Sequence, residues 1–207
     1  MVKFTKKDKR KNKKLMPERN ENYMNNIKKL CGFCINEWHL TTMILPYISK
    51  EIENNYKMIT ILENSIEENI KTLIKKLNLK NEEDILEINW KQSVAQKYTE
   101  VGSKLNIIAK SDEKYIILVN GRKNFIDVVN KHIDKWLKKN TKVKQEIKII
   151  NCYEITDFNY NITEILDSHD RIINTSGEKR IDEVFEDYKK EGKIEEATSK
   201  TNIRKGN

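Results

Sequence analysis

The chain has 207 residues, of which 35% are charged and 37% hydrophobic, and its formal net charge at pH 7 is +8. This length predicts one domain with appendages, and three cysteines in a lysine-rich chain argue against a disulfide framework. No apolar run is long enough to span a bilayer, and no hydrophobic segment follows the basic N-terminus, so a cytoplasmic location is expected.

Nearly all of the net positive charge lies in residues 1–19, which hold nine Lys or Arg against two acidic residues and so carry +7. A segment this charged buries too little apolar surface to offset its ordering entropy, so we expect a basic arm that is disordered when free. We expect this arm to attach to nucleic acid, an anionic membrane or an acidic protein, and a solubilising tail is the alternative. The predicted organisation is an arm over 1–22, an α/β domain over 23–189 and a polar tail over 190–207. The candidate polyanion-binding residues are Lys3, Lys6, Lys7, Lys9, Arg10, Lys11, Lys13, Lys14 and Arg19.

The domain begins with a strand, a helix and a second strand. The apolar run over 30–35 predicts a buried strand, and Asn36 is expected to cap a helix over 37–54. Pro46 lies inside this helix and predicts a kink or a later start. The run over 56–62 predicts the second strand.

The middle of the domain is less regular. Ser65 and Glu68 stand in the spacing of a capping box ahead of an amphipathic helix. The segment over 85–90 predicts a third strand. The runs over 105–109 and 115–119 flank a polar turn and predict a hairpin.

The last part of the domain again alternates helices with strands. Thr175 and Glu178 are expected to cap a final helix that places Ile181, Val184 and Phe185 on one side. The elements expected before that helix are a helix with an apolar stripe over 125–137, a strand over 147–153, a short helix over 161–168 and a strand over 171–174.

Strands that alternate with amphipathic helices, and that are themselves almost continuously apolar, indicate a mostly parallel sheet covered on both faces. The predicted fold class is therefore α/β, a three-layer sandwich with a central, mostly parallel sheet. The strands over 30–35, 56–62 and 147–153 are the most continuously apolar, so we expect them at the centre of the sheet.

The first strand-to-helix junction contains no phosphate-binding loop. It reads Cys34 to His39 without a glycine-rich pattern, and Glu37 places a negative charge where a phosphate needs donors. These features argue against ordinary P-loop NTP hydrolysis. No cofactor and no metal is assigned.

The Cys-x-x-Cys pair of Cys31 and Cys34 is expected to be structural. Residues three apart on a strand point to opposite faces, so the two thiols cannot chelate one ion. Buried free cysteines usually pack as small hydrophobic residues. Redox and metal-binding roles remain the alternatives.

Ligands of open α/β sheets bind outside the carboxyl ends of the strands, near a topological switch point. We expect Trp38, Tyr153 and Phe158 to supply the apolar wall of such a site. In the alternative of a small α/β enzyme, Glu154 or Asp157 acts as a general base partnered by a histidine. The candidate ligand-binding residues are Asn36, Trp38, His39, Glu63, Asn64, Tyr153, Glu154, Asp157 and His169.

Three stretches resemble the MEDS domain, the methanogen/methylotroph sensory domain, over roughly residues 28–177. They are KLCGFC followed by LTTMILPYISKEIENNYKMITILENS, then IINCYEITDF, and finally ILDSHDRIIN. Family members usually have histidine where Lys29 stands, an aromatic residue at the position of Cys34 and proline at the position of Asp170.

The resemblance implies a RecA/KaiC-like fold without ATPase motifs. It also implies a sensory role beside a histidine kinase or transcription regulator, with binding of a small organic ligand. We therefore expect a non-catalytic sensory or regulatory protein that binds a small ligand or a signalling partner and has no membrane span. The alternatives are a nucleic-acid-associated regulator or adaptor without a small ligand, and the small α/β enzyme described above.

Overall fold

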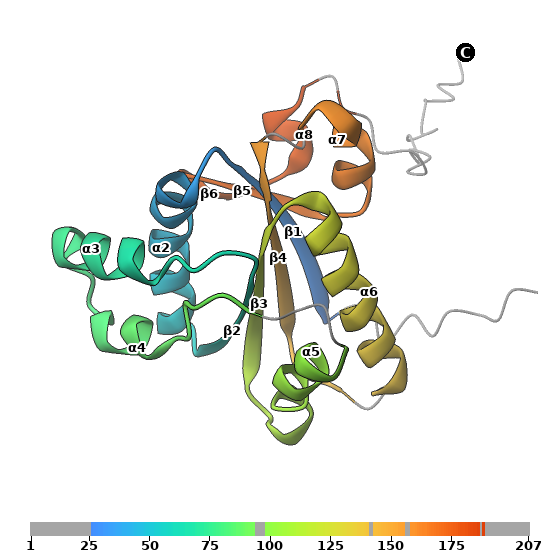
Figure 1. The fold of residues 1–207 in the computed structure, drawn as a ribbon, viewed down its shortest axis with the longest axis horizontal. Helices are drawn as coiled ribbons and strands as arrows, with labels where there is room; N and C mark the ends of the chain where they lie inside the picture. Colours follow the sequence, from blue (N-terminus) through green and yellow to red (C-terminus); the bar gives the residue numbers. More distant parts are fainter. Residues whose placement is uncertain (1–25, 94–97, 141–142, 156–157, 187, 189–207) are drawn as a thin grey trace, which may run out of the picture.

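Helices cover both faces of one central sheet, which confirms the predicted three-layer α/β architecture (Figure 1). The computed structural model describes residues 26–93, 98–140, 143–155, 158–186 and 188. In these residues the strand order is β2-β3-β4-β1-β5-β6, with β1 to β5 mutually parallel and β6 antiparallel to β5. The strands are β1 (Ile27–Cys34), β2 (Tyr56–Leu62), β3 (Lys114–Gly121), β4 (Ile147–Glu154), β5 (Arg171–Asn174) and β6 (Gly177–Lys179).

The helices divide between the two faces of the sheet. Alternation along β1 shows this, because Leu30 and Cys34 join the core under α2, α3 and α4, whereas Cys31 joins the core under α5, α6 and α7. The helices are α2 (Glu37–Glu53), α3 (Glu67–Leu77), α4 (Glu82–Glu87), α5 (Tyr98–Leu105), α6 (Lys123–Lys139), α7 (Phe158–Asp167) and α8 (Ile181–Val184), with a 3-10 turn η1 (Ile108–Lys110). The first helix begins at Glu37 and continues through Pro46, so the expected later start is wrong.

The predicted centre of the sheet is correct for β1 and β4 and wrong for β2, which is an edge strand. The second half of this edge is sheltered, because the backbone N–H of Ser93 donates to the carbonyl of Leu62 over 2.8 Å. Lys104 also donates from Nζ to the carbonyl of Thr60 over 2.7 Å. This cover lets an edge strand carry the apolar sequence that is typical of a central one.

Two segments in the middle of the chain that were predicted as strands contain helix ends and turns instead. The segment predicted as a strand over 85–90 contains the end of α4, after which Trp90 folds back and donates from Nε1 to the carbonyl of Ile85 over 2.8 Å. The predicted hairpin is wrong because 105–109 runs from the last residue of α5 through a turn into η1. Its expected partner β3 instead pairs in parallel with β2 and β4.

The two capping boxes predicted from sequence do not form. Helix α3 starts at Glu67, one residue too late for Ser65 to be its N-cap. Glu178 lies on β6 and accepts a hydrogen bond from the Tyr47 hydroxyl over 3.2 Å, so the segment after Thr175 is a strand. The short helix α8 follows, and its own cap pairs Arg180 with Glu183.

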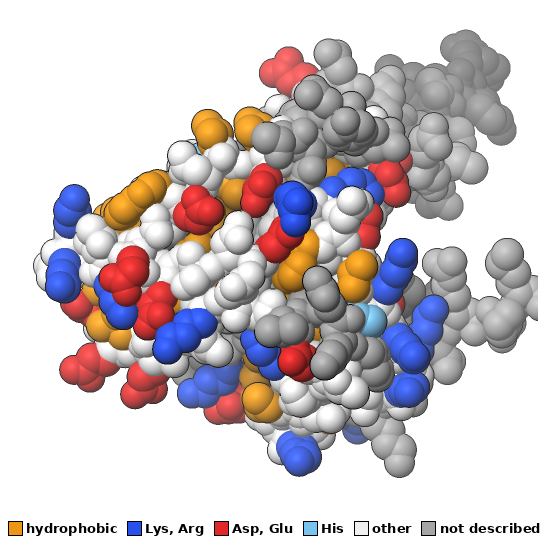
Figure 2. All heavy atoms as spheres, viewed as in Figure 1, with side chains coloured by type: hydrophobic (Ala, Val, Ile, Leu, Met, Phe, Trp, Pro, Cys, Tyr) orange, Lys and Arg blue, Asp and Glu red, His pale blue; other side chains and the backbone are white. Residues whose placement is uncertain are grey.

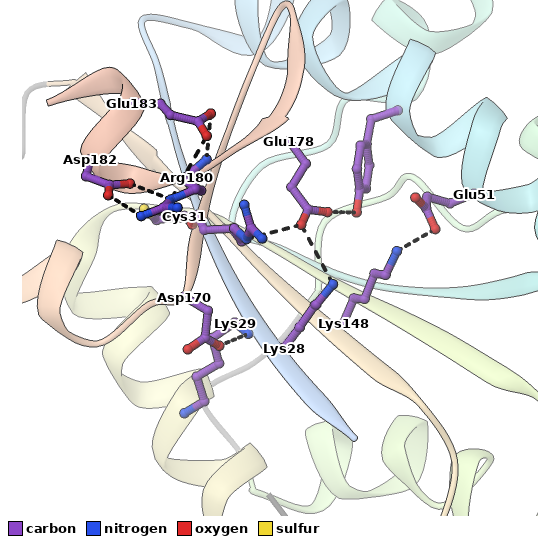
Figure 3. Close-up of polar contacts among 12 residues, drawn as sticks. Lys28, Lys29, Cys31, Glu51, Lys148, Asp170, Glu178, Arg180, Asp182 and Glu183 are labelled. Atoms are coloured by element: carbon purple, nitrogen blue, oxygen red, sulfur yellow. Dashed lines mark hydrogen bonds and ion pairs between the residues drawn. The ribbon is translucent and has the colours of Figure 1, made fainter. Parts of the chain in front are cut away.

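A buried ion pair lies between α2 and the first half of β4 (Figure 3). The ammonium of Lys148 is 2.7 Å from the carboxylate of Glu51, and both side chains are less than a tenth exposed. The ammonium also lies 4.4 Å from the ring centroid of Tyr56. This cluster adds a buried pair of charges beside the apolar core on the α2 face of the sheet.

The predicted arm over 1–22 and the tail over 190–207 lie outside the described residues, as do all nine candidate polyanion-binding residues. Of the helices that the structure describes, none has the length and apolar character needed to cross a membrane.

Candidate functional site

The structure distributes the described candidate residues over three places rather than one crevice. Asn36, Trp38, His39 and Glu154 lie where β1 and β4 end side by side. The other two places are the ends of β2 and β3, and the sheet face beneath α6 and α7. Asp157 lies outside the described residues, and the side chain of Phe158 is likewise not described.

The ends of β1 and β4 form a topological switch point, because α2 leaves β1 toward one face and α7 leaves β4 toward the other. The side chain of Asn36 accepts from the backbone N–H of His39 over 2.9 Å, which caps α2 as predicted. The ring Nδ1 of His39 in turn accepts from the backbone N–H of Ile35 over 3.2 Å. Both polar side chains are therefore occupied in ending β1 and starting α2.

Apolar side chains are exposed around the same switch point. Trp38 is 49% exposed, and its neighbours Ile35 and Ile155 are 64% and 42% exposed. Figure 2 shows hydrophobic side chains on the surface at this end of the molecule. Trp38 therefore belongs to an exposed apolar patch, whereas Tyr153, the second of the three predicted wall residues, lines a hollow elsewhere on the sheet.

Glu63 and Arg122 join the carboxyl ends of β2 and β3. The Glu63 carboxylate accepts from the backbone N–H of Arg122 over 2.6 Å and from its Nε over 2.9 Å. Partial burial opposes ionisation of Glu63, but the hydrogen bonds and charge of Arg122 outweigh it and lower the pKa of the carboxyl. Gly121 has a φ of +154°, and a Cβ there would lie 2.6 Å from the Glu63 side chain. Glu63 therefore fixes a strand junction, with Asn64 exposed beside it.

Tyr153 and His169 come together on the sheet face, with a third polar residue that sequence reasoning missed. Asn151 lies two residues before Tyr153 on β4, and its Nδ2 is 2.9 Å from Nε2 of His169. The other ring nitrogen of His169 is 2.5 Å from the carbonyl of Ile165, which can only accept. The proton of neutral His169 is thus assigned to Nδ1, so Asn151 donates to Nε2.

This pair lies at the floor of a hollow of about 350 Å³ between α6, α7 and the sheet, called the α6–α7 hollow. Asn151 and His169 are 1% and 2% exposed. The side-chain carbonyl of Asn151 accepts no hydrogen bond within the described part of the chain. A buried acceptor of this kind favours a donor beside it.

Charged side chains of both signs line the α6–α7 hollow. Lys29 is 3.1 Å from Asp134, and Lys123 is 2.8 Å from Asp127. Burial, followed by the nearby Asp127 carboxylate, raises the pKa of the Tyr153 hydroxyl, which therefore stays neutral. The charged residues lining it are Lys29, Lys123, Lys131, Asp127, Asp134 and Glu164.

The cysteines pack in the core. Cys31 and Cys34 lie in the cores on opposite faces of the sheet, as predicted, and Cys152 lies on the same face as Cys34. Burial, with the charge of Glu154, raises the pKa of Cys34 to about 12, so its thiol is protonated at neutral pH. In the described residues, no group of three or more His, Cys, Asp or Glu side chains is placed to hold a metal ion.

One signal in the sequence marked the missed residue. Asn151 follows Ile149 and Ile150 in the buried part of β4, and a polar residue inside a buried strand needs a partner. The hollow itself depends on how α6 and α7 pack, which no local pattern indicates.

Comparison with known proteins gives no further assignment: the chain matches no family model and no curated protein sequence.

Proposed function

We propose that the protein is a non-catalytic sensory or regulatory protein that binds a small polar organic ligand in the α6–α7 hollow. The observation that supports this most is the buried carbonyl of Asn151 at the floor of a polar hollow. The volume of the α6–α7 hollow falls within the usual range for sites that hold small molecules. A ligand with an N–H or O–H group can satisfy this carbonyl.

The charges around the hollow indicate the kind of ligand. Three lysines and three carboxylates line it, and two of the lysines are already paired with carboxylates. A balanced rim of this kind favours an uncharged or zwitterionic compound over a strong anion. The resemblance of the chain to MEDS domains supports the same class of function.

The hydrogen bonds of the two ring nitrogens of His169 favour a binding protein over an enzyme. A histidine acting as general base needs a ring nitrogen within reach of the substrate. Here Nε2 accepts from Asn151 and Nδ1 donates to the carbonyl of Ile165, so both nitrogens are engaged with neutral groups.

The test is a thermal-unfolding screen of the full chain against uncharged and zwitterionic metabolites, preceded by mass spectrometry of compounds that co-purify with it. A ligand at one hundred times its Kd should stabilise the native protein by about 2.7 kcal/mol. Asn151→Leu should abolish that stabilisation, and Lys75→Ala, on the distant helix α3, should preserve it. Equal binding by wild type and Asn151→Leu refutes the site.

A further inference from the structure

A second hollow, of about 440 Å³, opens beside the first half of β2 and is called the β2-edge hollow. The backbone groups of Thr60 and Leu62 point away from β3, because they bond to Lys104 and Ser93. Alternation along a strand then points the N–H and C=O groups of Tyr56 and Met58 outward as well. Both residues line the hollow, so it presents an open strand edge.

The β2-edge hollow is acidic. Asp84 and Glu87 of α4 line it together with Glu113, which precedes β3, and all three are exposed. Among the residues that the structure describes, Lys57 is the one basic residue that lines it, and its ammonium lies 4.0 Å from the Glu113 carboxylate. The hollow therefore suits an extended segment that is rich in lysine.

The chain itself contains such a segment. Residues 1–19 carry a net charge of +7, and Val2 and Phe4 alternate with Lys3 and Thr5 in the period of a strand. The arm joins the domain at Asn26, beside the amino end of β1, and Tyr56 lies at the amino end of β2 in the same parallel sheet. Three strand spacings separate β1 from β2, roughly 14 Å, which about five extended residues can span.

We propose that the basic arm of the chain docks on its own β2-edge hollow, adding a strand to β2 and placing lysines against Asp84, Glu87 and Glu113. Docking and polyanion attachment use the same lysines, so each excludes the other. The proposal is independent of the ligand site in the α6–α7 hollow.

The first test is zero-length carbodiimide cross-linking of the full chain at low salt, read by peptide mass spectrometry. Arm lysines should couple to Asp84, Glu87 and Glu113 at least five times more often than to the exposed Glu68 of α3. Even coupling to all exposed carboxylates overturns the proposal. A mixture of ¹⁴N and ¹⁵N protein should give cross-links within one isotope only, and mixed pairs would place the arm on a second copy instead.

The second test measures hydrogen exchange of the backbone over 56–62. The triple variant Asp84→Asn/Glu87→Gln/Glu113→Gln removes three surface ion pairs and should speed exchange there about tenfold. The matched variant Glu68→Gln/Glu183→Gln/Glu186→Gln changes the net charge equally at sites on α3, on α8 and just after α8, and should leave that exchange unchanged. Identical exchange in both variants overturns the docking site.

Discussion

Asn151 on β4 and His169 in the turn after α7 share a buried hydrogen bond of 2.9 Å, although they lie 18 residues apart in the sequence. The bond uses the N–H of the Asn151 side-chain amide, while the carbonyl of that amide accepts no hydrogen bond from the described residues. Buried polar groups that are only partly bonded cost stability, and proteins retain them at functional sites.

This bonding predicts a contrast between two buried asparagines. Asn151→Leu should lower the free energy of unfolding by only about 1 kcal/mol, because removing the unbonded side-chain carbonyl partly offsets the loss of the donor to Nε2 of His169. Asn120→Leu should cost about 2 kcal/mol, because its amide donates to the carbonyl of Cys152 over 3.0 Å. Urea unfolding measures both variants. A large loss for Asn151→Leu would assign the residue a purely structural role.

Sequence patterns identified the elements whose apolar residues form a continuous run or a regular stripe within one segment. The apolar runs of β1 and β4 and the stripe of α6 are strong signals, and all three elements formed where they were expected. The segment over 85–90 was wrongly predicted as a strand because it is rich in β-branched and aromatic residues. These residues instead pack where the chain turns back onto α4, as the hydrogen bond from Trp90 to Ile85 shows. The edge position of β2 was not predictable, because its cover comes from Ser93 and Lys104, residues distant in sequence.

The candidate site was partly predictable for a related reason. The rule that ligands bind at strand ends led to Trp38 and His39, and only the first of these is substantially exposed. Tyr153 and His169 were chosen as strand-end and helix-end residues, yet they meet on the face of the sheet. Their meeting depends on the packing of α7, which local sequence does not encode.

Glu63 should make stability depend on pH. Its pKa is lowered in the folded protein, so its contribution is present above the unfolded value, near pH 4, and is lost as the pH falls through the folded value. Glu63→Gln should therefore cost about 1 kcal/mol at pH 7 and almost nothing near pH 2. Gly121→Ala, which displaces Glu63, should weaken the same dependence. A cost of Glu63→Gln that is independent of pH would contradict the assigned bond.

The buried pair of Lys148 and Glu51 should be costly to break and inexpensive to replace. Glu51→Gln leaves a buried ammonium unpaired and should destabilise the protein by about 3 kcal/mol. The double variant Glu51→Leu/Lys148→Met removes both charges and should lie within about 1 kcal/mol of wild type. Denaturant unfolding of the singles and the double measures this coupling. Additive losses would mean that the two side chains do not interact.

Two residues at the switch point, Asn36 and Trp38, should differ in their contribution to stability. Asn36→Ala removes the cap of α2 and should cost about 1 kcal/mol. Trp38→Ala removes a half-exposed side chain and should change stability by less than about 0.5 kcal/mol. Thermal unfolding ranks the two variants, and a larger loss for Trp38→Ala would show that the ring is packed.

The basic arm should bind polyanions by releasing counterions. If four to six phosphates are engaged, the logarithm of affinity for duplex DNA should fall with the logarithm of salt with a slope of about −4 to −5. Little sequence preference is expected, because phosphate contacts do not read bases. A full-length variant with all nine arm Lys and Arg changed to Gln should lose this binding, whereas the same chain with five α6 lysines changed to Gln should keep it. Those five are Lys123, Lys131, Lys135, Lys138 and Lys139.

Equal binding by wild type and the arm variant would move the polyanion surface into the folded domain. Anionic vesicles titrated in parallel would show whether DNA or a membrane surface is the preferred partner.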